Sequence, residues 1–242
     1  MDSAVRVDRT RKWGVNDAAI GVVVATILVV LLSAAAVRGW PQDPKLSLLL
    51  SYLVVWVPLF GAVLIATLWR GARSLSEDFG LVFRPLDLLW GLTVGVLARL
   101  IAGLIEIAGY GRIGSAGATF GEPVRDLWWV FAAVLAPVVI GPFIEELFFR
   151  GLLVRAVTEF TRTSGGTRLA AIVVGILVSG FVFALVHILT ASTPTAAIVV
   201  GLSTFIFGAA AAVLAQVTGR LGGAIVAHVT FKALVVVPAL LG

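Results

Sequence analysis

The sequence contains no cysteine and few charged residues. Of its 242 residues, 13% are Asp, Glu, Lys or Arg, about half the share found in soluble globular domains. The absence of cysteine excludes disulfide bonds and thiol catalysis. Histidine is almost as scarce, with two copies in the whole chain. Any chemistry that needs an imidazole must therefore use one or both of them.

Apolar residues dominate the composition instead. Hydrophobic residues account for 60% of the chain, and a helix needs about 20 apolar residues to cross the hydrocarbon core of a bilayer. We therefore predict an all-α fold, a polytopic transmembrane helical bundle of about seven spans with short connections and no soluble domain. The predicted spans lie near residues 18–37, 47–69, 87–109, 127–148, 170–190, 195–217 and 222–241.

The first of these spans could instead be a signal peptide, because Ala34-Ala35-Ala36 resembles a cleavage site of small residues. Its apolar run is long for a signal peptide, however, and six more spans follow. We therefore expect a retained transmembrane helix.

The distribution of Lys and Arg indicates the orientation. With the N-terminus placed in the cytoplasm, twelve of the 18 cations lie on that side and four on the other, while Arg99 and Lys232 lie within spans. Cytoplasmic loops carry the excess of Lys and Arg in most membrane proteins. We therefore predict a protein of the plasma membrane with a cytoplasmic N-terminus. The net charge of +5 suits an anionic lipid bilayer as partner rather than nucleic acid.

Three connecting segments have a distinct composition. Residues 1–16 are polar and basic and predict a loose cytoplasmic tail. Residues 70–86 mix charged and apolar residues, which favours a short interfacial helix that ends near Pro85. Residues 110–124 are rich in glycine and predict a loop on the opposite side of the membrane.

The fourth span is interrupted by proline. Pro137 and the pair Gly141-Pro142 fall inside it, yet helical character resumes and continues past Arg150 toward Phe160. Membrane proteins tolerate such prolines where a cavity or a neighbouring helix satisfies the freed backbone groups. We expect the helix to open here around a hydrated pocket.

Two adjacent glutamates follow this interruption. Glu146 and Arg150 are four residues apart and can pair on one helical face, whereas Glu145 points about 100° away. A charge at the bilayer centre costs at least roughly 2.5–3.5 kcal/mol. One interpretation is an interfacial salt bridge at a helix end. The other is a catalytic carboxylate, Glu145, supported by a neighbouring ion pair.

Both histidines also lie in apolar spans. Phe183 precedes His187 by four residues and can stack on its ring, and Lys232 follows His228 by four residues on the same face. A single intramembrane histidine is often a packing residue. Two such residues together with a glutamate pair indicate instead a set of general-base hydrolase groups.

The same side chains could bind a metal ion. Zinc accepts nitrogen and oxygen ligands and lowers the pKa of bound water to about 7. The candidate ligands are Glu145, His187 and His228, and the sequence lacks an H-E-x-x-H motif. The cofactor is therefore either Zn²⁺, as in a metalloprotease, or none, with a glutamate-activated water.

The order of these motifs resembles a known family. E-E-x-x-x-R at residues 145–150, F-x-x-x-H at 183–187 and a final histidine segment at 228–232 follow one another in separate spans. The chain is similar in this respect to the CPBP intramembrane proteases, which comprise CAAX prenyl endopeptidases and relatives in bacteriocin processing and immunity. The resemblance implies an intramembrane endopeptidase that cuts a membrane-associated peptide or protein. It also implies a first pair of transmembrane helices over 17–74 and a protease core over 75–242.

The resemblance further implies roles for single residues. Glu145 would activate water together with His187, and His228 would help to stabilise the oxyanion. Glu146 and Arg150 would hold the helix that carries the E-E-x-x-x-R motif. The family usually has Asn four residues after the last histidine, where this chain has Lys232. A lysine can donate to an oxyanion, but it also repels a metal and can pair with Glu145.

Two other functions remain as alternatives. A non-catalytic scaffold or immunity protein is favoured by Lys232, and a proton-coupled transporter by the intramembrane ionisable residues. The enzyme hypothesis requires residues at different depths to meet. His187 lies about 28 Å along its helix from the cytoplasmic end and His228 about 12 Å. Glu145 reaches a shared depth only if its helix extends to about Phe160.

Overall fold

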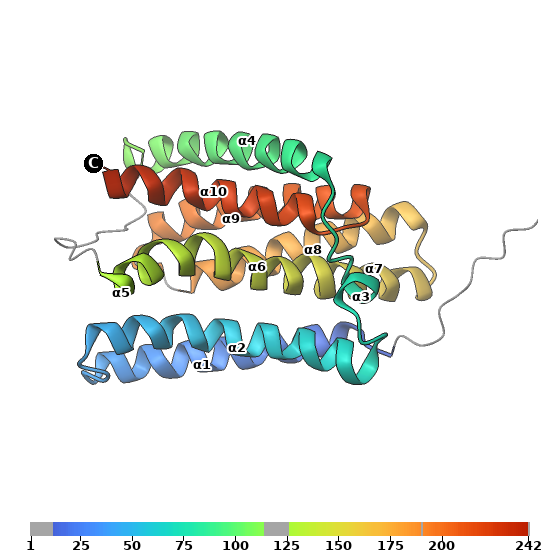
Figure 1. Cartoon of the computed structure of the whole chain (residues 1–242), viewed down its shortest axis with the longest axis horizontal. Helices are drawn as coiled ribbons and strands as arrows, with labels where there is room; N and C mark the ends of the chain where they lie inside the picture. Colours follow the sequence, from blue (N-terminus) through green and yellow to red (C-terminus); the bar gives the residue numbers. More distant parts are fainter. Residues whose placement is uncertain (1–11, 114–125, 190, 242) are drawn as a thin grey trace, which may run out of the picture.

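The computed structural model describes residues 12–113, 126–189 and 191–241. Within them the chain is helical and contains no strand, which confirms the predicted all-α bundle (Figure 1). Five segments, from α5 to α7, form one continuous helix. The elements are α1 (Val15–Val37), α2 (Pro44–Arg70), α3 (Leu75–Phe79), α4 (Pro85–Tyr110), α5 (Leu127–Trp129), η1 (Val130–Ile140), α6 (Gly141–Glu146), η2 (Leu147–Leu153), α7 (Val154–Thr163), α8 (Arg168–Ile188), α9 (Pro194–Thr218) and α10 (Gly222–Leu241).

The helices are those of an integral membrane protein. Six are long and apolar enough to cross a membrane, namely α1, α2, α4, the continuous helix α5–α7, α8 and α9, and α10 adds a shorter apolar helix over Gly222–Pro238. Large apolar side chains cover the outside of the bundle. On α4, for example, Leu88 and Leu100 are 58% and 61% exposed, which suits lipid and not water.

Residues 12–16 are held in place, whereas the sequence predicted a loose tail over residues 1–16. The first eleven residues of that tail lie outside the described part of the chain. The backbone N–H of Lys12 donates to the carbonyl of Arg70 at 2.7 Å, and the indole N–H of Trp13 donates to Asp78 at 3.1 Å. The part that the structure describes is therefore fixed to the end of α2 and to α3.

A short helix, α3, does form within residues 70–86, but its predicted end at Pro85 is wrong. The helix ends at Phe79, because Gly80 follows in the left-handed conformation (φ 72°) that favours glycine. Pro85 begins α4 instead, a position where its missing N–H costs nothing. The glycine-rich segment predicted at 110–124 lies almost entirely outside the described residues.

The fourth span is widened around Pro137 and is not broken. Leu127–Thr163 is one helix of 37 residues, so the expected opening is wrong. The stretches Val130–Ile140 and Leu147–Leu153 have π-helical hydrogen bonding, and Pro137 lies within the first of them. A π-turn bonds each N–H to the carbonyl five residues earlier, and this wider ladder accommodates a proline without ending the helix.

The same helix continues well past the glutamates. It runs beyond Arg150 and past Phe160 to Thr163, as the enzyme hypothesis requires. α7 and the first turns of α8 project beyond the nearby ends of α4 and α10 (Figure 1). α8 therefore begins further out along the bundle axis than α10 does.

This projection brings the two histidines to one depth. His187 lies about 28 Å along α8 from Arg168, and His228 lies about 9 Å along α10 from Gly222. The difference in distance is taken up by the projecting part of α7 and α8. Residues that the sequence alone places at unequal depths can therefore meet.

α4 and α10 are packed closely against each other. A Cβ atom on Gly95 would lie 2.6 Å from the carbonyl oxygen of Ala227, so only glycine allows this approach. At the end of both helices Arg220 pairs with the buried Asp87 at 2.8 Å. These contacts fix α10, and with it His228, against α4.

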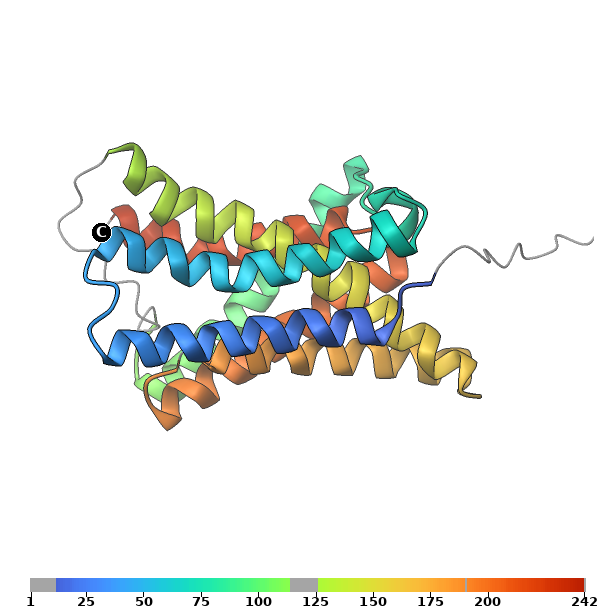
Figure 2. The same ribbon diagram turned by 90° about the horizontal axis from the view of Figure 1, so that it is seen from below.

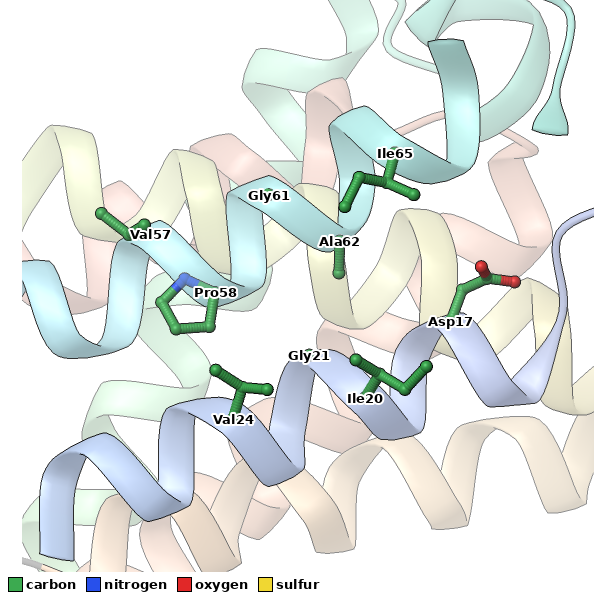
Figure 3. Close-up of a pocket in the computed structure, with 9 residues that line it drawn as sticks. All are labelled: Asp17, Ile20, Gly21, Val24, Val57, Pro58, Gly61, Ala62 and Ile65. Carbon is green, nitrogen blue, oxygen red and sulfur yellow. The ribbon is translucent and has the colours of Figure 1, made fainter. Parts of the chain in front are cut away.

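α1 and α2 form a hairpin along one side of the bundle (Figures 1 and 2). A groove of about 310 Å³ lies between them, and apolar side chains such as Val24, Val57 and Pro58 line it (Figure 3). Asp17 lies at one end of the groove, where Arg70 binds its carboxylate at 2.6 Å. The groove contains none of the residues that the sequence predicts for catalysis.

Candidate active site

Glu146 and Arg150 form a fully buried ion pair on the continuous helix. Arg150 Nη1 lies 2.9 Å from Glu146 Oε1, and both side chains are 0% exposed. Arg150 Nη2 also donates to the carbonyl of Gly208 on α9 at 3.2 Å, and its guanidinium lies 4.5 Å from the ring centre of Phe183. A buried charge requires such compensation. The predicted pairing therefore exists, in the interior and not at a helix end.

Glu145 points away from this pair toward both histidines. Its Oε2 atom lies 3.9 Å from His187 Nε2 and 3.7 Å from His228 Nε2. The Glu145 side chain is 14% exposed, and Oε2 has no hydrogen-bond partner among the described residues. The structure thus brings the three predicted catalytic side chains close together.

His187 is oriented by the preceding turn of α8. Its Nδ1 atom lies 2.8 Å from the carbonyl oxygen of Phe183. Because a carbonyl only accepts, Nδ1 carries the proton and Nε2 is left as an acceptor in the neutral ring. The ring centre lies 4.3 Å from that of Phe183 at an angle of 45°. The predicted contact between these rings is present, although it is tilted and not stacked.

His228 is oriented by the second glutamate. Its Nδ1 atom lies 2.8 Å from Glu146 Oε1, and its ring is held by Phe207 at 4.7 Å. A carboxylate paired with a guanidinium is an acceptor, so that Nδ1–H of His228 donates to Glu146. His228 Nε2 then faces Glu145. A carboxylate that holds one imidazole nitrogen in this way fixes both the tautomer and the orientation of the ring.

Lys232 lies one helical turn beyond His228 and is partly buried. Among the described residues no carboxylate lies within ion-pairing distance of it. Its positive charge nevertheless acts on Glu145, His187 and His228. The direct pairing with Glu145 that the sequence left open is not formed.

α9 supplies residues that the sequence reasoning missed. The carbonyl of Gly208 binds Arg150, and Phe207 packs against His228. A Cβ atom on Gly208 would lie 3.2 Å from both Gly180 Cα and the Phe183 ring, so this glycine lets α9 approach α8. Small and aromatic residues are common throughout the chain, and no pattern distinguishes these positions.

The candidate metal ligands can be tested against this geometry. Two ligand atoms about 2.1 Å from a tetrahedral zinc lie about 3.4 Å apart, whereas Glu145 Oε2 lies 3.9 and 3.7 Å from the nitrogens of His187 and His228. Within the described residues no three His, Cys, Asp or Glu side chains are grouped to hold a metal ion. The charge of Lys232 also opposes a divalent cation. The donor set therefore does not fit zinc in this arrangement.

Comparison with known proteins assigns the segment that carries these residues. Residues 127–234 match the family model described as type II CAAX prenyl endopeptidase Rce1-like. The chain carries an Rce1-like domain. The matched segment begins at α5 and ends within α10, so it includes both glutamates, both histidines and Lys232. No curated protein and no solved structure matches the chain.

The match confirms the resemblance to CPBP-type CAAX proteases. An Rce1-like domain indicates a membrane peptidase, which is a hydrolase, so the predicted enzyme class is confirmed at this level. α1 to α4 precede the matched segment. The division into a helix pair over 17–74 and a protease core over 75–242 remains a prediction.

Proposed function

We propose that the protein is an intramembrane endopeptidase that hydrolyses a peptide bond of a membrane-associated substrate with a water activated by Glu145. The observation that carries this proposal is the convergence of Glu145 Oε2 with His187 Nε2 and His228 Nε2, at 3.9 and 3.7 Å. The Rce1-like domain over 127–234 supports the same class of reaction.

The separations suit a shared water molecule. They are too long for direct hydrogen bonds, but two atoms about 3.8 Å apart can both contact one water oxygen at about 2.8 Å. Glu145 Oε2 and the neutral His187 Nε2 are acceptors, so each can receive one proton of the water. The lone pairs of the water oxygen are then directed away from both groups and toward a substrate carbonyl.

The reaction proceeds by general-base catalysis. Glu145 takes one proton as the water oxygen bonds to the carbonyl carbon, and the carbonyl oxygen becomes an oxyanion. Lys232, and His228 when it carries a second proton on Nε2, can donate to that oxyanion. Glu146 stabilises the resulting imidazolium through Nδ1. The C–N bond then breaks, and the leaving nitrogen takes the proton held by Glu145.

The supporting charges make this site tolerable inside a bilayer. Two carboxylates, Glu145 and Glu146, stand against two cations, Arg150 and Lys232, so the formal charges sum to zero when both histidines are neutral. Arg150 offsets Glu146 by direct contact, and Lys232 acts on Glu145 at longer range. Glu145 thereby keeps a free oxygen for water.

The proposal includes an orientation in the plasma membrane. The connections near Arg70, Arg162 and Arg220 lie at the end of the bundle that carries most of the Lys and Arg residues, and Arg38 and Lys45 lie at the other end. By the excess of cations in cytoplasmic loops, the first end and the N-terminus face the cytoplasm. The substrate is a membrane-associated peptide or protein.

The proposal is tested with purified protein in liposomes that contain a panel of membrane-anchored peptides, with products identified by mass spectrometry. Glu145→Gln keeps the shape of the side chain but removes the base, and we expect turnover to fall by at least about 100-fold. His187→Gln should also lower turnover strongly. Glu159→Gln, at an exposed position on α7, is the control. Equal cleavage by the Glu145 and His187 variants and by the native protein would contradict the proposed mechanism.

A further inference from the structure

α4 carries a second buried ion pair, outside the segment that matches the family. Arg99 Nη2 binds both carboxylate oxygens of Glu106, at 2.8 and 2.7 Å. The two side chains are 12% and 5% exposed and lie within a membrane-spanning helix. Ionised residues in such positions are expensive and usually serve a function. The proposed catalytic steps make no use of this pair.

Aromatic rings connect this pair to the candidate active site. The Arg99 guanidinium lies 5.9 Å from the ring centre of Phe231 on α10. Phe231 stacks on Phe207 of α9, with centres 4.7 Å apart and planes 28° apart. Phe207 in turn lies 4.7 Å from the ring of His228. Two buried phenylalanines therefore fill the space between Arg99 and His228.

The backbones around this contact leave little freedom. A Cβ atom on Gly91 of α4 would lie 2.5 Å from Val226 of α10, and one on Gly95 would lie 2.6 Å from the carbonyl oxygen of Ala227. α4 and α10 thus touch through their backbones just before the level of Arg99. The position of Arg99 on α4 relative to Phe231 on α10 is therefore fixed.

We propose that Arg99 and Glu106 are positioning residues for His228. The ion pair holds the Arg99 guanidinium against Phe231, and Phe231 and Phe207 hold the His228 ring with Nε2 directed at Glu145. The inference rests on the proposed function, because His228 needs this orientation only if it takes part in hydrolysis. Neither Arg99 nor Glu106 contacts the reacting atoms.

The first test separates positioning from folding. Arg99→Met combined with Glu106→Leu replaces both charges by apolar side chains, which buried ion pairs often tolerate without loss of stability. We expect this folded variant to lose about 10- to 100-fold in kcat, because small displacements of catalytic groups have effects of this size, with KM changed less than about twofold. Arg99→Lys keeps the charge and should restore part of kcat.

Two further variants complete the activity test. Phe231→Leu should lower kcat through the same contact, and its effect should be less than additive with that of the pair variant. The matched control is the exposed pair Glu159 and Arg162 on α7, whose replacement by glutamines should leave kcat unchanged. A folded Arg99 and Glu106 variant with native kcat would overturn the proposal.

The second test does not depend on activity. Since the chain has two histidines, ¹⁵N-histidine labelling in lipid nanodiscs gives a two-residue spectrum, which His187→Gln assigns. In the pair variant we expect the Nδ1 resonance of His228 to shift or broaden while that of His187 stays unchanged. Unchanged His228 resonances, or equal changes in both residues, would contradict positioning. If turnover does not depend on Glu145, the proposed function fails, and the spectrum still decides the inference.

Discussion

The bundle interior and the α1–α2 hairpin place charge in different ways. In the interior, Glu146 and Arg150 are 0% exposed and bind each other and a histidine. In the hairpin, the ion pair between Asp17 and Arg70 lies at the helix ends, where Arg70 is 44% exposed. The first pair has no access to water and must be satisfied by protein groups, whereas the second is partly solvated.

This difference indicates that the Asp17–Arg70 pair holds two helices together, whereas the Glu146–Arg150 pair supports the candidate active site. Asp17 accepts from the backbone of Gly14 as well as from Arg70, and so caps α1 and ties it to α2. Glu146 binds His228 as well as Arg150, and so connects the guanidinium of Arg150 to the imidazole of His228. Apart from Asp17 at one end, the residues that line the hairpin groove carry no polar side chain. We infer that the hairpin serves membrane embedding and support of the domain that carries the site.

Removal of one cation from each pair should give the largest contrast. Arg150→Met leaves Glu146 buried without its cation, which typically costs 3–5 kcal/mol. Arg70→Met leaves Asp17, whose side chain is 6% exposed, with its backbone partner, and we expect a smaller loss because the cation removed is 44% exposed. The free energy of unfolding in an SDS titration measures both. Equal losses would mean that the interior pair is no better isolated from water than the pair at the helix ends.

Substitution of Lys232 tests whether a charge in the bundle interior takes part in catalysis. If its ammonium donates to the oxyanion, Lys232→Met should lower kcat by roughly 10- to 1,000-fold, as loss of such a donor does. Lys232→Asn retains a neutral donor and should keep more of the activity than Met does. Single-turnover rates in liposomes measure the difference.

The opposite result for Lys232 has a clear meaning. A higher kcat for Lys232→Asn than for the native chain would show that the lysine restrains Glu145. Activity that appears only in this variant would favour the non-catalytic scaffold or immunity protein. The stability of α10 in both variants is the control, since Lys232 forms no ion pair with the described residues.

The sequence predicted much of the fold because a bilayer imposes simple rules. The length of each apolar run predicted a membrane-spanning helix, and the i,i+4 spacing of Glu146 and Arg150 predicted their pairing. Proline spacing could not predict the π-helical stretches, because whether a proline breaks or widens a helix depends on its neighbours. The shared depth of His187 and His228 depended on how far α7 and α8 project, which is a property of packing and not of composition.

The least predictable part of the site came from α9. Gly208 and Phe207 contact Arg150 and His228, yet their helix contains many small and aromatic residues. Arg99 and Glu106 were visible as charges within a span, but their connection to His228 passes through two rings on other helices. The spacing of residues along one helix cannot predict contacts of this kind, because they join different helices.

The smallest contrast is expected between two glycines of the α1–α2 hairpin. A Cβ atom on Gly21 would lie 2.7 Å from Phe148 and 2.9 Å from Ala62, whereas one on Gly61 would meet nothing within 4 Å. We expect Gly21→Ala to destabilise the protein by about 1–3 kcal/mol through overpacking. Gly61→Ala should be neutral or stabilise it by up to about 1 kcal/mol, the helix propensity of alanine over glycine.

Activity measurements turn this pair of variants into a test of the hairpin's role. Gly61→Ala adds a methyl group at the groove and should leave kcat and KM at native values. Phe148 lies on η2 of the continuous helix, three residues after Glu145, so the displacement in Gly21→Ala should lower kcat modestly if α1 supports the site through that helix. Native kcat in a destabilised Gly21→Ala protein would restrict the hairpin to membrane embedding. A lowered kcat in Gly61→Ala would instead bring the groove itself into the function of the site.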